Sequence, residues 1–395
     1  MSTERFYHLA NPSEWATAPT IYSYTSLRQI EKCPLAWQLQ NSKYTNFEGY
    51  PARPNPAGIE GEIVHEIVEK FFRAVASQGM PVITSEPFKK CVAEFDLPGS
   101  IGKAIEHRLE VIRQHPRGRG FRLFCSVQDI QNKVVRLFRE QYDKLKIIDP
   151  FTAETYERLA NNRISFGGKN NQDLFGLLKK RRILTEIALT LKNPPFRMVI
   201  DLVCLDSNEH VVISDFKSCA FKQEYIEQLL LCSILWEKTT HVIPHYVYVV
   251  CVDRVESVSI NGDLLGKLNL ELIRRIIKAN EALANAPATA RLNESCCFCS
   301  VRQFCSKYWQ CLLEAWDDRL GTGIVDAEIM VEGIPTEYGF NGKMADGKTV
   351  NVVYGKDIWK IHGPFTPAEK LHIISGKRQP SAIELMMWTE IFHCG

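Results

Sequence analysis

Two aspartates and a lysine are the residues whose types and spacing best suit hydrolytic chemistry. Asp201 interrupts an apolar run over residues 198–205, and Asp215 and Lys217 lie near the end of a β-branched run over residues 211–217. The short polar loop between the runs predicts an antiparallel hairpin. If the ends of the runs pair across that loop, Asp201 faces Asp215, and like charges facing each other are destabilising. A Mg²⁺ or Mn²⁺ ion would offset the repulsion, because hard cations prefer carboxylate oxygens.

Lys217 belongs to the same group, because it lies two residues after Asp215 and therefore points to the same face of its strand. A structural explanation, in which each acid ends a strand and pairs with the lysine, suffices for either acid alone. It accounts less well for three charged groups on one face with apolar flanks. An amphipathic helix predicted directly downstream (residues 223–236) carries Gln228 on the face that also holds Tyr225.

Cysteines form the second group of residues that could carry chemistry. Cys296, Cys299 and Cys305 have a C-x₂-C-x₅-C spacing, at which thiolates can share one metal centre. Two residues compete for the fourth position: Cys311 would complete a local Cys₄ zinc site, whereas Cys33 would tie the N-terminal region to this distant segment. Packed free thiols are the alternative, but they explain poorly why four of the 13 cysteines fall within ten residues.

Composition places few limits on function. The chain has 395 residues, of which 45% are hydrophobic and 24% charged, and a net charge of +2. These values fit a soluble protein of two or three domains without a global basic surface. The sequence shows no apolar run of membrane-spanning length and no signal peptide. We therefore expect a cytoplasmic protein with no membrane contact, in which cysteines are thiols or metal ligands.

The elements upstream of the hairpin are predicted to be mainly helical. A helix over residues 58–73 carries His65 at the edge of its apolar stripe, where a lone histidine usually belongs to a core. A basic cluster at residues 115–122 is either a solvated loop or a phosphate contact. A strand predicted over residues 182–191 carries Glu186.

The C-terminal region changes character after residues 321–323. Five short alternating runs separated by turns, including residues 357–363, predict strands of a small β-domain. An OB-like barrel that binds single-stranded DNA is one expectation, and a domain for packing or partner contacts is the other. The residues that would contact DNA are Trp359, Lys360, His362, Lys377 and Arg378.

The order of these motifs resembles the RecB-like branch of the PD-(D/E)XK nucleases. The matching elements are I-D ending at Asp201, D-F-K from Asp215 to Lys217, and a helix with Q-L-L-L-C beginning at Gln228. The resemblance implies that the two aspartates are metal ligands and that Lys217 positions or activates the attacking water. It also implies that Gln228 is the first residue of the helix signature.

The resemblance adds ligands to this metal site. The G-x-x-x-H-x-x-x-E form from Gly61 to Glu69 matches the RecB-like histidine motif, which implies that His65 is a third ligand. It also implies that Glu186 joins the site and that the backbone carbonyl of Phe216 contributes. Two positions depart from the family pattern, which has glycine where Met198 stands and tyrosine where Cys232 stands.

The cysteines resemble those of a subset of RecB-like nucleases that includes AddB and the CRISPR-adaptation nuclease. In that subset one N-terminal and three C-terminal cysteines hold a 4Fe–4S cluster. The resemblance therefore implies Cys33, Cys296, Cys299 and Cys305 as cluster ligands, with structural zinc as the alternative.

Together these inferences predict an N-terminal arm (residues 1–21), a RecB-like core (22–320) and a small β-barrel-like domain (324–395). The core would have the α/β restriction-endonuclease-like fold, a mixed sheet flanked by helices, with helical insertions. The expected function is metal-dependent DNA exonuclease activity on single-stranded or end-containing DNA in repair, recombination or CRISPR-type processing. The alternatives are a DNA-binding partner subunit of a protein complex, with a vestigial or partner-activated site, and a zinc-stabilised binding module.

Overall fold

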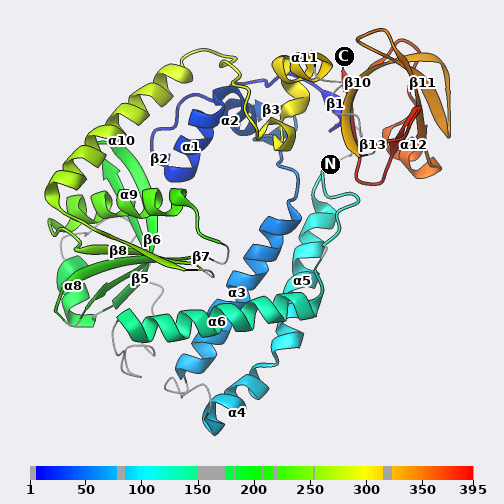
Figure 1. Cartoon of the computed structure of the whole chain (residues 1–395). Helices are drawn as coiled ribbons and strands as arrows, with labels where there is room; N and C mark the ends of the chain where they lie inside the picture. Colours follow the sequence, from blue (N-terminus) through cyan, green and yellow to red (C-terminus); the bar gives the residue numbers. More distant parts are fainter. Residues whose placement is uncertain are drawn as a thin grey trace.

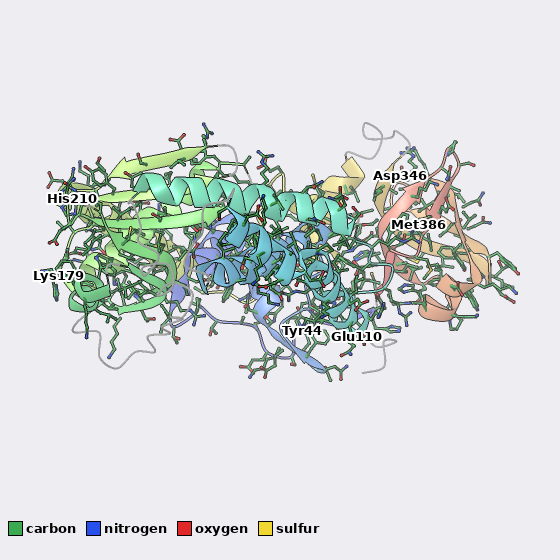
Figure 2. All side chains as sticks on the ribbon, turned by 90° about the horizontal axis from the view of Figure 1, so that it is seen from below. Tyr44, Glu110, Lys179, His210, Asp346 and Met386 are labelled. Atoms are coloured by element: carbon green, nitrogen blue, oxygen red, sulfur yellow. The ribbon has the colours of Figure 1, made fainter. Side chains whose placement is uncertain are left out.

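The computed structural model describes most of the chain as an arc of three parts (Figure 1). A six-stranded sheet and a C-terminal barrel lie at opposite ends, with helices between them. Lys179 and His210 label one end and Asp346 and Met386 the other (Figure 2). The described residues are 6–77, 85–123, 125–148, 174–181, 183–206, 208–217, 220–251, 254–314 and 323–394. Some side chains within these ranges, among them those of His65, Glu186 and Phe216, lie outside the description.

The first sheet is mixed. Its strands are β2 (Tyr22–Ser23), β5 (Ile183–Lys192), β6 (Pro195–Leu205), β7 (Val211–Lys217), β8 (Tyr246–Cys251) and β9 (Val255–Ser259). The strand order is β2-β6-β7-β8-β9, and β5 also pairs with β6. The β5–β6, β6–β7 and β8–β9 pairs are antiparallel, whereas β7 and β8 run parallel.

Helices cover this sheet and bury their apolar faces against it. They are α1 (Tyr24–Lys32), α8 (Leu174–Arg181), α9 (Gln223–Thr240) and α10 (Gly262–Ala282). The helix α9 packs on β5 to β8 and also against α10, so it is buried on most of its surface. The Arg275 guanidinium links α10 to α1 and α9. Its Nε lies 2.6 Å from Glu31 Oε1 on α1, and its Nη1 lies 2.5 Å from Glu227 Oε1 on α9. This ion-pair network fixes α9 over the sheet.

A helical region with its own core follows the N-terminal segment. It consists of α3 (Pro56–Ser77), α4 (Glu86–Phe95), α5 (Leu97–Gln114) and α6 (Val127–Ile148). The apolar stripe predicted for α3 is buried, with Ile63 and Ile67 fully inaccessible beside Ile101 and Ile130. The helical prediction for this part of the chain is therefore confirmed wherever the structure describes it.

The cysteine-rich segment is made of short elements. Those before it are α2 (Pro34–Asn41), β3 (Lys43–Tyr44) and β4 (Phe47–Glu48). The segment itself contains the single-turn helices η3 (Cys296–Phe298) and η4 (Arg302–Phe304), followed by α11 (Ser306–Glu314). In the sequence, the C-terminal domain follows this segment.

The C-terminal domain is a closed ring of strands. Its elements are β10 (Ile324–Thr336), β11 (Gly339–Met344), β12 (Thr349–Tyr354), α12 (Lys356–His362), β13 (Lys370–Arg378), β14 (Ala382–Leu385) and β15 (Glu390–Cys394). The ring runs β10-β11-β12-β14-β13 and closes through β13–β10, with only its β12–β14 pair parallel. The strand β15 extends the sheet beside β13, and β1 (His8–Leu9) pairs with β15 in parallel. The predicted C-terminal all-β region is thus present.

One predicted strand of this domain is wrong. Residues 357–363 fall almost entirely within helix α12, which begins after Gly355 and ends before Gly363. The helix buries Ile358 and His362, which are four residues apart and therefore share one helical face. Seven residues are too few for their alternating pattern to distinguish a helix from a strand.

Candidate active site and cysteine pocket

The predicted hairpin register is confirmed. Leu205 of β6 pairs with Val211 of β7, and the last matched pair toward the open end is Leu202 with Ser214. One step further along the same register, Asp201 faces Asp215. The two acids therefore occupy neighbouring positions on adjacent strands, as the sequence predicts.

A third acidic position continues this row. On β5, Thr185 pairs with Leu202 and Ile187 pairs with Ile200, so the backbone of Glu186 lies opposite Asp201. Strands β5, β6 and β7 thus carry an acid at three successive positions across the sheet. The Glu186 side chain, like the His65 side chain on α3, lies outside the described part of the structure.

Lys217 is held against Asp215. Its Nζ lies 2.7 Å from Asp215 Oδ2, and the Asp215 side chain is only 4% exposed. Burial lowers the pKa of Lys217, but the nearby Asp215 and Asp201 carboxylates outweigh burial and raise it. The lysine is therefore a stable cation between two acids.

The chemistry of these groups fits a divalent cation. Both Asp215 carboxylate oxygens are buried; Lys217 Nζ lies 2.7 Å from Oδ2, whereas Oδ1 has no hydrogen-bond donor among the described residues. Buried acceptors without donors are energetically costly, and a hard cation would satisfy them through its preference for oxygen. Within the described side chains, no group of three or more His, Cys, Asp or Glu is arranged to hold a metal ion. The further ligands implied by resemblance, His65 and Glu186, are among the side chains not described.

The two departures from the family pattern contact each other. The Met198 Sδ and Cys232 Sγ atoms are 3.9 Å apart, and both side chains are buried. A large side chain at the glycine position thus fills space beside a small side chain at the tyrosine position. Burial raises the pKa of the Cys232 thiol well above its usual value, with smaller contributions from Asp215 and Asp201. Cys232 therefore adds no charge to the acidic row.

Tyr225 is a site residue whose role the sequence did not assign. The Lys217 ammonium lies 5.2 Å from the centroid of the Tyr225 ring, within the range of a cation–π contact. Tyr225 precedes Gln228 by three residues on α9, and both side chains are half-buried. The sequence signal that could have identified Tyr225 is that it shares a helix face with Gln228.

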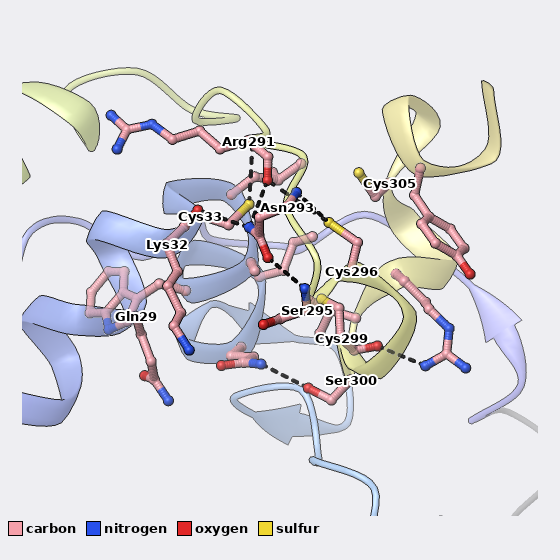
Figure 3. Close-up of a pocket in the computed structure, with 18 of the residues that line it drawn as sticks. Gln29, Lys32, Cys33, Arg291, Asn293, Ser295, Cys296, Cys299, Ser300 and Cys305 are labelled. Carbon is pink, nitrogen blue, oxygen red and sulfur yellow. Dashed lines mark hydrogen bonds between the residues drawn. The ribbon is translucent and has the colours of Figure 1, made fainter. Parts of the chain in front are cut away.

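Four cysteines gather around one cavity of about 240 Å³ (Figure 3). They are Cys33, Cys296, Cys299 and Cys305. The backbone N–H of Arg291 donates to Cys33 Sγ over 3.5 Å, and burial raises the pKa of Cys299 to about 11.

Two other cysteines of this segment, Cys297 and Cys311, do not line this cavity. The Cys297 side chain is exposed, and its thiol donates to the Glu294 carbonyl over 3.5 Å. Cys311 lies on α11, three residues after Tyr308, which lines the pocket. Of the two competitors for the fourth position, the fold therefore brings Cys33 to the other three cysteines.

Comparisons with known proteins identify the family. The family model of the PD-(D/E)XK nuclease superfamily matches residues 21–306, which is well over half of the chain. The chain therefore belongs to the PD-(D/E)XK nuclease superfamily, whose members are generally metal-dependent nucleases. No curated protein matches it. Among solved structures, the crystal structure of the p204 HINb domain is similar at 10% identity and a TM-score of 0.17, over 53% of this chain and 90% of that one.

The barrel residues expected to contact DNA are largely engaged elsewhere. His362 is 5% exposed and meets the Tyr7 ring edge-on, with centroids 4.4 Å apart. Trp359 is partly buried and packs against the barrel core, and Lys377 pairs with Glu384 at 3.3 Å. Residues 323–395 contain seven Lys and Arg against nine Asp and Glu. His362 is therefore too buried to stack on a base, whereas contact of the partly buried Trp359 with DNA stays a prediction.

Within the described residues, no helix is long and apolar enough to cross a membrane.

Proposed function

We propose that this chain is a Mg²⁺- or Mn²⁺-dependent DNA exonuclease of the RecB-like type, acting on single-stranded or end-containing DNA. The observation that carries the proposal is the acidic pair formed by the half-buried Asp201 and the buried Asp215, with Lys217 Nζ 2.7 Å from Asp215 Oδ2. Membership of a nuclease superfamily supports it.

Each residue of the site has a role in this proposal. The carboxylates of Asp201, Asp215 and Glu186, the His65 imidazole and the Phe216 carbonyl would hold the ion. When bound, the ion stabilises negative charge on the phosphodiester and lowers the pKa of a bound water. Lys217 would orient the attacking water beside the acids, and Gln228 would orient the substrate from α9.

The cysteine pocket favours a 4Fe–4S cluster over zinc. One tetrahedral ion with bonds of about 2.3 Å needs four sulfur atoms in close convergence. The four cysteines line one cavity of about 240 Å³ together with other residues, which leaves room for a multi-atom cluster. A structural zinc ion is the alternative.

An OB-like assignment for the barrel also belongs to the proposal. Three antiparallel strands, a helix, and two further strands with a parallel β12–β14 closure support it. Its excess of acidic residues argues against a large phosphate-binding surface. A role in orienting the substrate or a protein partner fits that charge better.

A cleavage assay tests the proposed activity. Anaerobically purified protein is incubated with end-labelled single- and double-stranded DNA and Mg²⁺ or Mn²⁺. We expect Asp215→Asn to reduce cleavage by at least about 10³-fold, because removing one electrostatic contributor in other enzymes costs 10²–10³ and this acid also binds the ion. The matched control is Glu256→Gln, an exposed acid of the same sheet on β9. Asp215→Asn protein that cleaves as fast as wild type would overturn the assignment.

The second candidate is a DNA-binding partner subunit whose site is vestigial or completed by another protein. Exposed apolar side chains on the barrel favour it, since Ile334 is 89% and Tyr338 is 59% exposed near the β10–β11 turn. Such patches are typical of protein contacts. DNA binding without cleavage by wild-type protein under all these conditions would favour this candidate.

A further inference from the structure

We propose that the segment from Cys299 to Cys305, here called the cysteine loop, attaches the C-terminal barrel to the rest of the chain. We call this attachment the mount. Occupation of the cysteine pocket then holds the barrel in position against the rest of the chain. The part that concerns occupation rests on the proposed metal centre, whereas the mount itself rests on contacts within this chain.

Arg302 links a pocket cysteine to the first barrel strand. Its Nη1 donates to the Cys299 carbonyl over 3.0 Å, while Nε and Nη2 bond to Asp326 of β10 at 2.5 and 3.3 Å. Asp326 also accepts from the Tyr308 hydroxyl over 2.8 Å and from the Ser375 backbone N–H over 2.8 Å. Both Arg302 and Asp326 are less than 10% exposed. One buried ion pair therefore joins the loop, α11, β10 and β13.

Arg117 makes a second link of the same kind. Its Nη1 donates to the Ser300 carbonyl over 2.5 Å, and Nε and Nη2 each bond to a carboxylate oxygen of Glu390 on β15 at 2.7 Å. Its side chain is fully buried. This finding corrects one interpretation of the basic cluster at residues 115–122, because Arg117 faces the barrel and cannot contact phosphates.

A third carbonyl of the loop is bound directly by the barrel. His372 Nδ1 donates to the Gln303 carbonyl over 2.8 Å, and the His372 ring stacks on Trp309 at 4.1 Å. An apolar cluster surrounds these polar links and spans the contact between the loop region and the barrel. It includes Val301 and Trp309 from the loop region and Ile374 and Phe392 from the barrel. The sulfur-bearing side chains of Cys296, Cys299 and Cys305 pack against the same cluster.

The loop is poorly suited to hold this shape by itself. Its regular structure is limited to η4 and part of the adjoining turn, and isolated 3₁₀ turns have weak hydrogen-bond geometry. Ligation at Cys299 and Cys305 would fix both ends of the loop. Buried carbonyls and ion pairs are strongly sensitive to displacement, because a partner left unsatisfied in the interior is destabilising. Emptying the pocket should therefore loosen the barrel.

Hydrogen–deuterium exchange with metal analysis tests this inference. Cys33→Ser removes a pocket cysteine that lies outside the loop, so an effect on the barrel must be transmitted through the pocket. We expect loss of bound metal and at least tenfold faster amide exchange in β15 and the first half of β10, with α9 unchanged. The matched control, Cys311→Ser, should keep both the metal and the protection.

Two further variants separate the mount from the metal centre. Arg302→Met and Asp326→Asn should keep the metal yet accelerate exchange in the same strands by a similar factor. Unchanged barrel exchange in a metal-free Cys33→Ser protein would overturn the coupling, and unchanged exchange in both mount variants would overturn the mount. If anaerobic wild type contains no metal in stoichiometric amount, the proposed centre fails, while the Arg302 and Asp326 variants still decide whether the loop carries the barrel.

Discussion

The hairpin site and the cysteine pocket differ in how the chain builds them. Asp201, Asp215 and Lys217 belong to one hairpin, and the register of two adjacent strands is enough to bring them together. Cys33, by contrast, bonds to the backbone of Arg291, 258 residues away in sequence. A site of the first kind is set by local pairing, and its loss should affect chemistry before stability. A site of the second kind exists only in the assembled fold, so its loss should affect the assembly.

The largest expected effect distinguishes charge balance from chemistry within the hairpin site. Lys217→Met should lower the free energy of unfolding by about 3 kcal/mol, because it leaves the buried Asp215 carboxylate without a counterion. Asp215→Asn should change it by less than about 1 kcal/mol, because the Lys217 side chain is more exposed than that of Asp215 and keeps Asp201 as an acidic neighbour. Urea unfolding at neutral pH measures both values. Equal losses for the two variants would contradict the local origin of the site.

A double-mutant cycle tests whether Met198 and Cys232, the two departures from the family pattern, fill one shared volume. Met198→Gly should cost about 3 kcal/mol through the cavity it leaves, and Cys232→Tyr about 2 kcal/mol through overpacking. The double variant should lose at least about 1 kcal/mol less than the sum, because the ring would occupy the vacated space. Strictly additive losses would mean that the two positions do not share one volume.

A pH effect is expected at the contact between the barrel and the N-terminal segment. Burial lowers the pKa of His362 to about 3, with smaller contributions from His393 and Arg119. Its neutral form is thus favoured in the folded state, so its contribution to stability is complete above the unfolded pKa of about 6.5 and is lost as the pH falls toward 3. At pH 5 the loss should be about 2 kcal/mol. In His362→Phe the decrease in melting temperature between pH 7.5 and 5 should be smaller than in wild type, and an identical decrease would exclude this residue as a source.

The smallest expected effect concerns Tyr225. Tyr225→Leu should lower kcat for DNA cleavage about two- to fivefold, which corresponds to a cation–π contact of about 0.5–1 kcal/mol with Lys217. Tyr225→Phe keeps the aromatic face and should retain wild-type kcat. A loss in the phenylalanine variant equal to that in the leucine variant would assign the effect to the hydroxyl group instead.

The sequence predicted those features that depend on short-range pattern. The apolar run of residues 198–205, the β-branched run of residues 211–217 and the polar loop between them predicted the hairpin and its register, and the spacing of the C-terminal cysteines marked the pocket segment. The residues that the sequence misjudged depend on distant partners. Arg117 resembles a surface cation until Glu390 is placed beside it, and the apolar alternation of residues 357–363 does not reveal that the segment is helical. The closed ring of the barrel could not be derived either, because its closure pairs strands that are not consecutive.

The pairing of β1 with β15 has a consequence for the order of folding. His8 and Leu9 pair with His393 and Cys394, two segments that are far apart along the chain. Contacts between distant segments form late, because the entropy of closing the long intervening loop must be lost before the contacts are gained. We therefore expect Phe6 and Tyr7, which are buried against Phe392 in the finished fold, to remain exposed until the barrel has formed.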